Sequence, residues 1–168
     1  MKKENILAAP KVEKVVISMK LGEDRHDKVL LAALISDLAA ISGQQPKICR
    51  AKKAIASFKI QAGEQIGLMV TLRGQRMVAF LKKLFKIVLP RVRDFQGVKL
   101  AGFDGRGNYS LGINEYAVFP EINSEKIKKV HGLEVTLVTT AGDDKKGQKL
   151  LAGLGMPFAH AQGEPKKG

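Results

Sequence analysis

Few residues in this chain have the types and spacing that catalysis or metal binding requires. The three histidines, His26, His131 and His160, are far apart, and none has a metal-ligand spacing to another histidine or to Cys49. We therefore expect solvated surface histidines. Cys49 has no histidine partner in its segment, which favours a small packed residue over a nucleophile. We expect no metal site and no cofactor.

The glycines around residue 106 resemble a phosphate-binding loop at first sight. The G-x-G-x-x-G pattern fails, however, because Ser110 stands where the third glycine belongs and no helix follows directly. Gly105 and Gly107 are better explained by turns with positive φ. Asp104 and Glu115 do not form a convincing acid/base pair. An enzyme acting on RNA remains an alternative, but it would need a carboxylate cluster or a cofactor loop.

Positive charge is the strongest chemical feature of the sequence. The 168 residues carry a formal net charge of +13. Residues 46–93 contain 12 basic residues and a single acid, Glu64, whereas the flanking parts are nearly balanced. A solvated surface usually mixes the two signs. This asymmetry indicates a polyanion partner, with nucleic acid as the first candidate and an acidic membrane surface as the second.

The remaining composition narrows the class of protein and the kind of nucleic acid that we expect it to bind. Apolar residues make up 45% of the chain, which is enough for a real core. No apolar run approaches the roughly 18 residues of a membrane helix, and the first ten residues lack the apolar region of a secretory signal. A single cysteine fits a reducing compartment. Because aromatic residues are only 5% of the chain, we expect shape and backbone readout of a folded RNA rather than base stacking.

Periodicity predicts the elements that must position these residues. Alternation predicts strands at 11–20, 66–73 and 133–140, with weaker candidates for strands at 47–51 and 109–114. The i, i+3, i+4 pattern predicts a helix from an N-cap at Asp24 to about residue 42, and a second helix at 75–89 that Pro90 ends. Asp143 or Asp144 caps a third helix through residue 154. Residues 52–65 are predicted to be a long, mobile hairpin connection.

This order predicts an α+β fold with a mostly antiparallel sheet, helices packed on one face and RNA on the other. The helix at 75–89 has basic residues on one side, as a membrane-surface helix does. Its apolar stripe nevertheless has the right width to cover a sheet. We expect one domain over residues 1–158 and a disordered tail over 159–168.

Several strings occur together and in order: RAKKAIASFKIQAGEQIGLMVTLRG (50–74), LPRVRDFQG (89–97), FDGRGNYSLG (103–112), FPEI (119–122) and VTTA with LLAGLGMPF (138–158). The chain thereby resembles the bacterial form of large ribosomal subunit protein 5, the universal 5S rRNA-binding family. The resemblance covers about residues 10–158. It implies a structural protein, not an enzyme, that is ribosome-bound in the cytoplasm and does not bind a membrane.

The resemblance also implies partners. The sheet would grip 5S rRNA and help attach it in the central protuberance, beside 23S rRNA and neighbouring large-subunit proteins. A flexible loop would contact P-site tRNA, and a bridge would reach a small-subunit head protein. By position, the 5S rRNA set is Ser18, Gln44, Arg50, Lys52, Lys53, Thr71 and Arg73. The tRNA loop is Ala56, Ser57, Phe58, Lys59, Ile60, Gln61, Ala62 and Gly63, and the bridge set is Asp104, Arg106 and Asn108.

Two departures from the family pattern stand out. The family usually has asparagine where this chain has Ser18, and a serine keeps a hydroxyl but lacks the two amide donors. The family also has an extra helix before the first strand, which we expect this chain to lack. The tail is longer than usual and has no assigned role.

Overall fold

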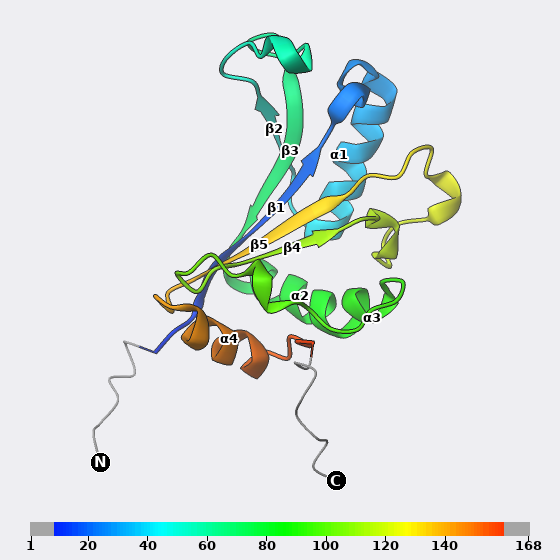
Figure 1. The fold of residues 1–168 in the computed structure, drawn as a ribbon. Coiled ribbons are helices and arrows are strands. Elements are labelled where there is room, and N and C mark those ends of the chain that lie inside the picture. Colours follow the sequence, from blue (N-terminus) through cyan, green and yellow to red (C-terminus); the bar gives the residue numbers. More distant parts are fainter. Residues whose placement is uncertain (1–8, 160–168) are drawn as a thin grey trace, which may run out of the picture.

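The computed structural model describes residues 9–159 (Figure 1). The predicted absence of an N-terminal helix concerns residues 1–8, which lie outside the described residues. Residues 160–168 of the predicted disordered tail, 159–168, also lie outside them, whereas Ala159 is described and donates its backbone N–H to the Val98 carbonyl oxygen at 3.0 Å. The principal elements are β1 (Val12–Lys20), α1 (Lys28–Ser42), β2 (Lys47–Arg50), β3 (Gln65–Leu72), α2 (Gly74–Lys83), α3 (Leu89–Arg91), β4 (Tyr109–Ile113), β5 (Leu133–Thr139) and α4 (Asp144–Gly153).

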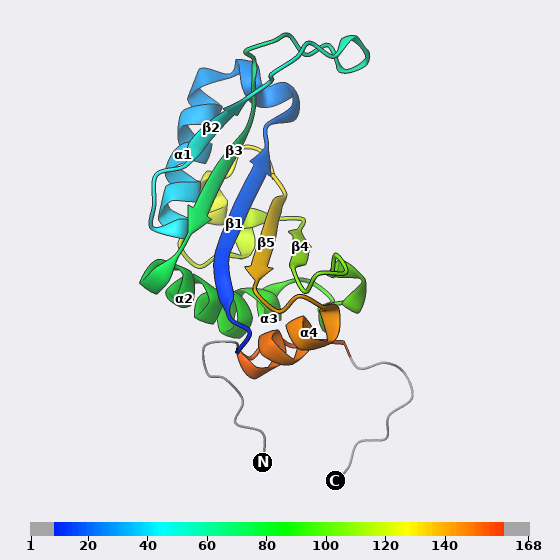
Figure 2. The same cartoon turned by 90° about the vertical axis from the view of Figure 1, so that its left-hand side faces the viewer.

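The five strands form one antiparallel sheet in the order β2-β3-β1-β5-β4. One face carries the alternating apolar side chains of β1, β3 and β5, which are buried together with residues of α1 and α2 in a single hydrophobic cluster. Figure 2 shows α1 behind the sheet, where it covers this buried face. Both Figures 1 and 2 show α2, α3 and α4 at the lower end of the sheet. The predicted α+β fold with an antiparallel sheet is confirmed.

The alternation in β3 shows why the strands form as predicted. Leu68, Val70 and Leu72 are buried, whereas the intervening residues Met69 and Thr71 are only half-buried. A strand places successive side chains on opposite faces, so this pattern buries one face and leaves the other for a partner.

The start of α1 differs from the prediction. A short 3-10 helix, Gly22–His26, comes first, and the N-cap of α1 is Asp27, whose carboxylate accepts the backbone N–H groups of Val29 and Leu30. The predicted cap, Asp24, lies inside the short helix and pairs with Lys129 instead, at 2.8 Å. Both aspartates satisfy the N-cap rule locally, and a residue 105 positions away engages one of them.

The second predicted helix does not end at Pro90. After α2, residues Leu84–Val88 form a π-helical stretch, and α3 continues through the proline to Arg91. Proline has no N–H to donate, and the wide π turn ahead of it changes the local hydrogen-bond register. The predicted apolar stripe is confirmed, since Met77, Phe80 and Leu84 are all buried.

Candidate nucleic-acid interface

One face of the sheet has no helix over it (Figure 2). We call it the open face. The strand register places on it Lys14, Val16, Ser18, Lys20, Lys47, Cys49, Gly67, Met69, Thr71, Ser110, Gly112, Glu134, Thr136 and Val138. None of these side chains is buried. Small, hydroxyl-bearing and basic residues therefore share a surface that a large partner can approach.

Two of the predicted RNA-facing residues lie near the middle of the open face. Ser18 is opposite Met69, and Thr71 is opposite Val16, so the two hydroxyl residues are diagonal neighbours on β1 and β3. A second hydroxyl pair follows across β4 and β5, where the oxygens of Ser110 and Thr136 are 3.2 Å apart. Hydroxyl groups donate to and accept from sugar and phosphate oxygens.

Gln44 reaches the same region from the end of α1. Its side-chain amide donates to the carbonyl oxygen of Thr71 at 3.2 Å, and Arg76 of α2 donates to the side-chain oxygen of Gln44 at 3.4 Å. The left-handed Gly43, which ends α1, turns the chain toward the sheet here. Gln44, Thr71 and Arg76 thus form one polar group, although only the first two belong to the predicted set.

The other predicted basic residues divide between two ends of the sheet. Arg50 ends β2 opposite Gln65 and donates to the carbonyl oxygen of Gly63 at 3.1 Å, and the exposed Lys52 and Lys53 follow after Ala51. Arg73 lies beyond the opposite end of β3, at the N-cap of α2. Eight strand residues separate these groups, a span of roughly 25 Å. The predicted set therefore follows the length of the sheet rather than forming one cluster.

The predicted tRNA loop forms a small hairpin at residues 55–64, which we call the hairpin. Ile55 and Ile60 exchange backbone hydrogen bonds of 2.8 and 3.1 Å, and Lys59 adopts a left-handed conformation at φ 51°. Phe58, at the tip, is 70% exposed. The predicted connection thus has regular local structure, and its mobility stays a prediction.

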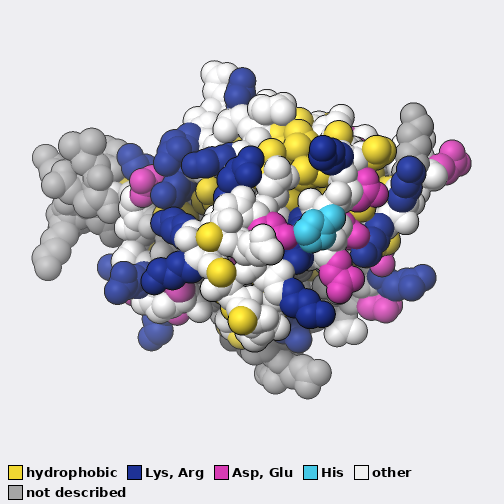
Figure 3. Space-filling model, turned by 90° about the horizontal axis from the view of Figure 1, so that it is seen from above, with side chains coloured by type: hydrophobic (Ala, Val, Ile, Leu, Met, Phe, Trp, Pro, Cys, Tyr) yellow, Lys and Arg dark blue, Asp and Glu magenta, His cyan; other side chains and the backbone are white. Residues whose placement is uncertain are grey.

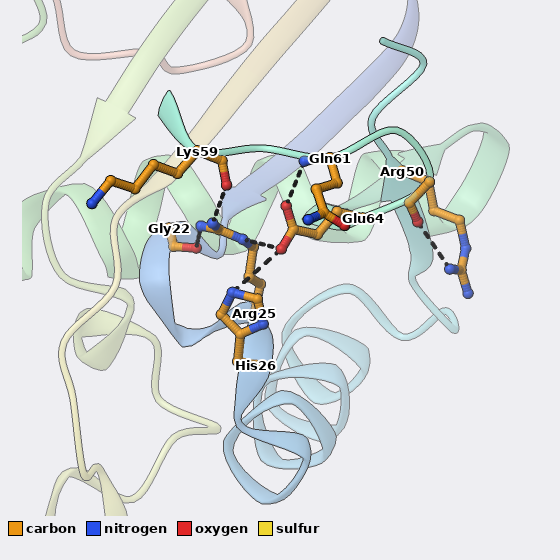
Figure 4. A network of polar contacts seen from close by, with 8 residues as sticks. Gly22, Arg25, His26, Arg50, Lys59, Gln61 and Glu64 are labelled. Atoms are coloured by element: carbon orange, nitrogen blue, oxygen red, sulfur yellow. Dashed lines mark hydrogen bonds and ion pairs between the residues drawn. The ribbon is translucent and has the colours of Figure 1, made fainter. Parts of the chain in front are cut away.

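Arg25 of the short 3-10 helix attaches the hairpin to the body of the protein (Figure 4). Its guanidinium contacts the Glu64 carboxylate at 2.9 Å and donates to the carbonyl oxygens of Gly22 at 2.7 Å and Lys59 at 3.2 Å. Glu64 also accepts the backbone N–H of Gln61 and lies 3.3 Å from His26. The hydrogen bond from Arg25 is the main reason that the pKa of Glu64 falls below its ordinary value of 4.5.

The predicted bridge residues lie in a tight turn, residues 104–108, which we call the glycine loop. The Asp104 carboxylate accepts the backbone N–H of Arg106 at 2.8 Å and the side-chain amide of Asn108 at 2.7 Å. The bond from Asn108 is the largest cause of the lowered pKa of Asp104. Asp104 and Asn108 therefore shape the loop, and Arg106 is exposed at its centre.

Asp144, the first residue of α4, holds the glycine loop from the other side. Its two carboxylate oxygens accept the backbone N–H groups of Gly105 at 3.2 Å and Gly107 at 3.0 Å. Thr139 donates its hydroxyl to the Gly107 carbonyl oxygen at 2.7 Å. A Cβ at Gly147 would come within 2.7 Å of that same oxygen, so α4 packs directly on the loop.

The charge of the middle segment is not uniformly available to a partner. Figure 3 shows Lys and Arg side chains gathered on the left of the molecule and acidic side chains more frequent on the right. Lys83, one of the basic residues of this segment, donates to the Ile41 carbonyl oxygen at 2.6 Å and to Glu121 at 2.5 Å. Its ammonium also lies 5.7 Å from the Phe80 ring centre.

The histidine prediction needs one correction. His131 is not solvated: it is 7% exposed, and its Nε2 lies 3.4 Å from Asp24. His26 is exposed as predicted, and His160 lies outside the described residues. Within residues 9–159, no three His, Cys, Asp or Glu side chains are grouped to hold a metal ion. No helix in the same range is long and apolar enough to cross a membrane.

Comparison with known proteins bears on the whole described chain. A family profile described as the C-terminus of the ribosomal L5 family matches residues 65–158, and one described as ribosomal protein L5 matches residues 5–61. The chain belongs to the ribosomal L5 family. Curated relatives named large ribosomal subunit protein uL5 are 53% identical in Halothermothrix orenii and 55% identical in Roseiflexus castenholzii. Each alignment covers 92% of this chain, and 87% and 86% of the relatives.

Membership of the L5 family confirms the resemblance found in the sequence. The protein is a structural constituent of the large ribosomal subunit, and the role of the family is structural rather than enzymatic. The rRNA-binding character of the family agrees with a chain whose one uncovered sheet face is bordered by basic residues.

Sequence reasoning on this L5-family chain missed three residues that organise the interface. Arg25 holds the hairpin, Arg76 holds Gln44, and Asp144 holds the glycine loop. Arg25 and Asp144 contact partners more than 30 positions away. Glu64 offered the one available signal, since a single acid among 12 basic residues needs a local reason.

Proposed function

We propose that this protein binds 5S rRNA through the open face and helps attach that RNA in the central protuberance of the large subunit. The observation that carries the proposal is a sheet face with no helix over it, with hydroxyl residues in its middle and basic residues at its ends. We place the protein on the ribosome in the cytoplasm, against 23S rRNA and neighbouring large-subunit proteins.

The mechanism follows from the chemistry of the basic residues at the ends of the open face and of the polar residues between them. Arg50, Lys52 and Lys53 at one end and Arg73 at the other neutralise phosphates, which supplies most of the affinity. Between these two ends, Thr71 and Gln44 hydrogen-bond sugar and phosphate oxygens, and Ser18 hydrogen-bonds a sugar oxygen. These contacts set the register. An A-form helix displays its 2′-hydroxyls in a wide, shallow minor groove, a shape that a sheet face can follow.

Salt dependence tests the electrostatic part. Neutralising about 6–10 phosphates implies a loss of affinity for 5S rRNA of about 10³–10⁵ between 50 and 200 mM salt. Arg50→Ala and Lys53→Ala should each weaken binding and reduce the slope of log K against log salt by about 1. Lys145→Ala, an exposed lysine on α4, is the matched control and should leave the affinity unchanged. A binding constant that barely responds to salt contradicts the mechanism.

Ser18 tests the readout in the middle of the face. Ser18→Asn restores the amide donors that the family pattern supplies, at a position on the open face. We expect tighter binding to 5S rRNA with an unchanged salt slope, measured by titration. An asparagine that weakens binding would contradict the placement of this residue against RNA.

We further propose that the hairpin contacts P-site tRNA and that Arg106 of the glycine loop contacts a small-subunit head protein. The exposed Phe58 at the tip of the hairpin supports the first contact, and the exposed Arg106 on a tightly bonded loop supports the second. Phe58→Ala and Lys59→Ala should leave 5S rRNA affinity intact and change tRNA footprints on ribosomes. Loss of 5S rRNA binding in either variant would overturn this division.

A further inference from the structure

One acidic side chain lies on the open face. Among the strand residues that the register places there, Glu134 of β5 is the sole acid, directly opposite Ser18 on one side and Gly112 on the other. It is exposed, and no described residue forms an ion pair or hydrogen bond with its carboxylate. An unpaired carboxylate is unexpected on a face that must approach a polyanion.

A groove adjoins this carboxylate where β1 ends and β5 begins. Its volume is about 430 Å³, and its lining includes Ser18, Lys20, Gly112, Asn114, Gly132 and Glu134. Both glycines are exposed, and a Cβ at Gly112 would meet open space. The strands beside Glu134 thus leave room above the sheet for a group of the partner.

The charges restrict what that group can be. A phosphate beside Glu134 would be repelled, whereas a carboxylate accepts strongly from N–H donors and can take two at once. Guanine carries adjacent N–H donors on N1 and N2, and its 2-amino group is displayed in the minor groove of an A-form helix. Ser18 and Asn114 supply further donors and acceptors at the rim of the groove.

We propose that Glu134 and the adjoining groove form a base-reading site for a guanine of the bound RNA, whose 2-amino group donates to the Glu134 carboxylate. The inference rests on the proposed binding of 5S rRNA to the open face. It adds sequence readout at one point of a surface that otherwise recognises backbone and shape. Lys20, at the other side of the groove, is available to the phosphate of the same strand.

The test compares Glu134→Ala and Glu134→Gln with the wild-type protein in binding to 5S rRNA at fixed salt. Truncation should weaken binding by about 10- to 150-fold, the range of one hydrogen bond to a charged group. Glutamine replaces one acceptor oxygen by a donor, so it should also weaken binding. Glu13→Gln removes one exposed acidic charge from the start of β1 and serves as the matched control, with no loss expected. Unchanged or tighter binding by both Glu134 variants overturns the site, since removing a merely repulsive charge strengthens binding.

RNA substitution identifies the group that Glu134 contacts. Chemical probing should show one guanine protected by the wild-type protein and exposed with Glu134→Ala. Inosine, which lacks the 2-amino group, should be placed at that position. It should lower the affinity of the wild-type protein by the same factor as Glu134→Ala does, and the affinity should fall no further when both changes are combined. If 2′-deoxyguanosine abolishes the Glu134 dependence instead, the partner is a ribose hydroxyl and the guanine assignment is wrong. Failure of the wild-type protein to bind 5S rRNA would overturn the proposed function itself.

Discussion

The hairpin at residues 55–64 and the glycine loop at residues 104–108 both carry exposed side chains that we propose as contacts, Phe58 and Arg106, but the two segments are held in different ways. The hairpin is joined to the short 3-10 helix mainly through Arg25 and Glu64, which are 12% and 18% exposed. The glycine loop is fixed by carboxylates that accept its backbone N–H groups and by close packing on α4. We therefore expect that release of the hairpin costs the fold little, whereas release of the glycine loop destabilises it.

Gly107→Ala should have the largest effect. Gly107 has φ +85°, and a Cβ there would lie 2.7 Å from the Asp143 carbonyl oxygen. Strain and overpacking together should lower the free energy of unfolding by about 2–5 kcal/mol, measured by urea titration. Gly105→Ala is the matched control, since Gly105 has φ +86° but open space around its Cβ position. Equal effects of the two changes would mean that packing on α4 does not fix the loop.

Asp144→Ala should have the second-largest effect on stability. It removes the acceptor for two backbone N–H groups, of which that of Gly107 is partly buried. We expect the free energy of unfolding to fall by about 1–3 kcal/mol, the usual cost of an unsatisfied buried donor. Asp144→Asn keeps one acceptor oxygen and should lose less. Thermal or urea unfolding measures both, and a neutral alanine variant would contradict backbone attachment.

Arg25→Ala should affect the hairpin far more than the fold. A partly exposed ion pair contributes little to global stability, so the free energy of unfolding should change by less than about 1 kcal/mol. Hydrogen exchange of the backbone amides in the hairpin should nevertheless become faster, because the contacts to Glu64 and to the Lys59 carbonyl oxygen are lost. Arg25→Lys is the informative control: it keeps the charge but cannot form all three contacts. Full protection in Arg25→Lys would show that charge alone attaches the hairpin.

Acidification should release the hairpin with the smallest change in global stability. The pKa of Glu64 is lowered in the folded protein, so its contribution is present at neutral pH and is lost as the pH falls below 4.5 through the folded value. Amide chemical shifts of the hairpin, followed from pH 6 to pH 3, should report this titration. Glu64→Gln should abolish it. A titration that persists in this variant would assign the transition to another group.

Patterns in the sequence predicted the features of the fold that depend on residues close together in the chain. Alternation located β3 and β5, and the helical stripe located the buried Met77, Phe80 and Leu84. The sequence pattern wrongly placed the N-cap of α1 at Asp24 instead of Asp27, because two aspartates three positions apart satisfy the same N-cap rule. The engagement of Asp24 by Lys129 and the burial of His131 beside it depend on chain segments that periodicity cannot bring together.

The candidate interface divides in the same way. The charge count singled out residues 46–93, which contain Arg50, Lys52 and Lys53 at one end of the open face, and the open face follows from strand alternation. The count did not reveal that Lys83 is tied to Ile41 and Glu121, because that requires the path of α1 beside α2. The charge count also did not reveal the attachment of the hairpin. The pair that forms it, Arg25 and Glu64, is 39 positions apart, and no sequence motif connects the two residues.

The position of β2 at one edge of the sheet has a consequence for the protein before it meets RNA. An uncovered edge strand offers unpaired backbone groups on which another copy can add a strand, the route to aggregation. β2 has only four residues, with exposed Lys47 and Arg50 at its two ends and a register irregularity before Arg50. Short length, charge and an irregular edge all discourage such pairing. The cations at this edge therefore also oppose the pairing of β2 with a strand of another copy of the chain.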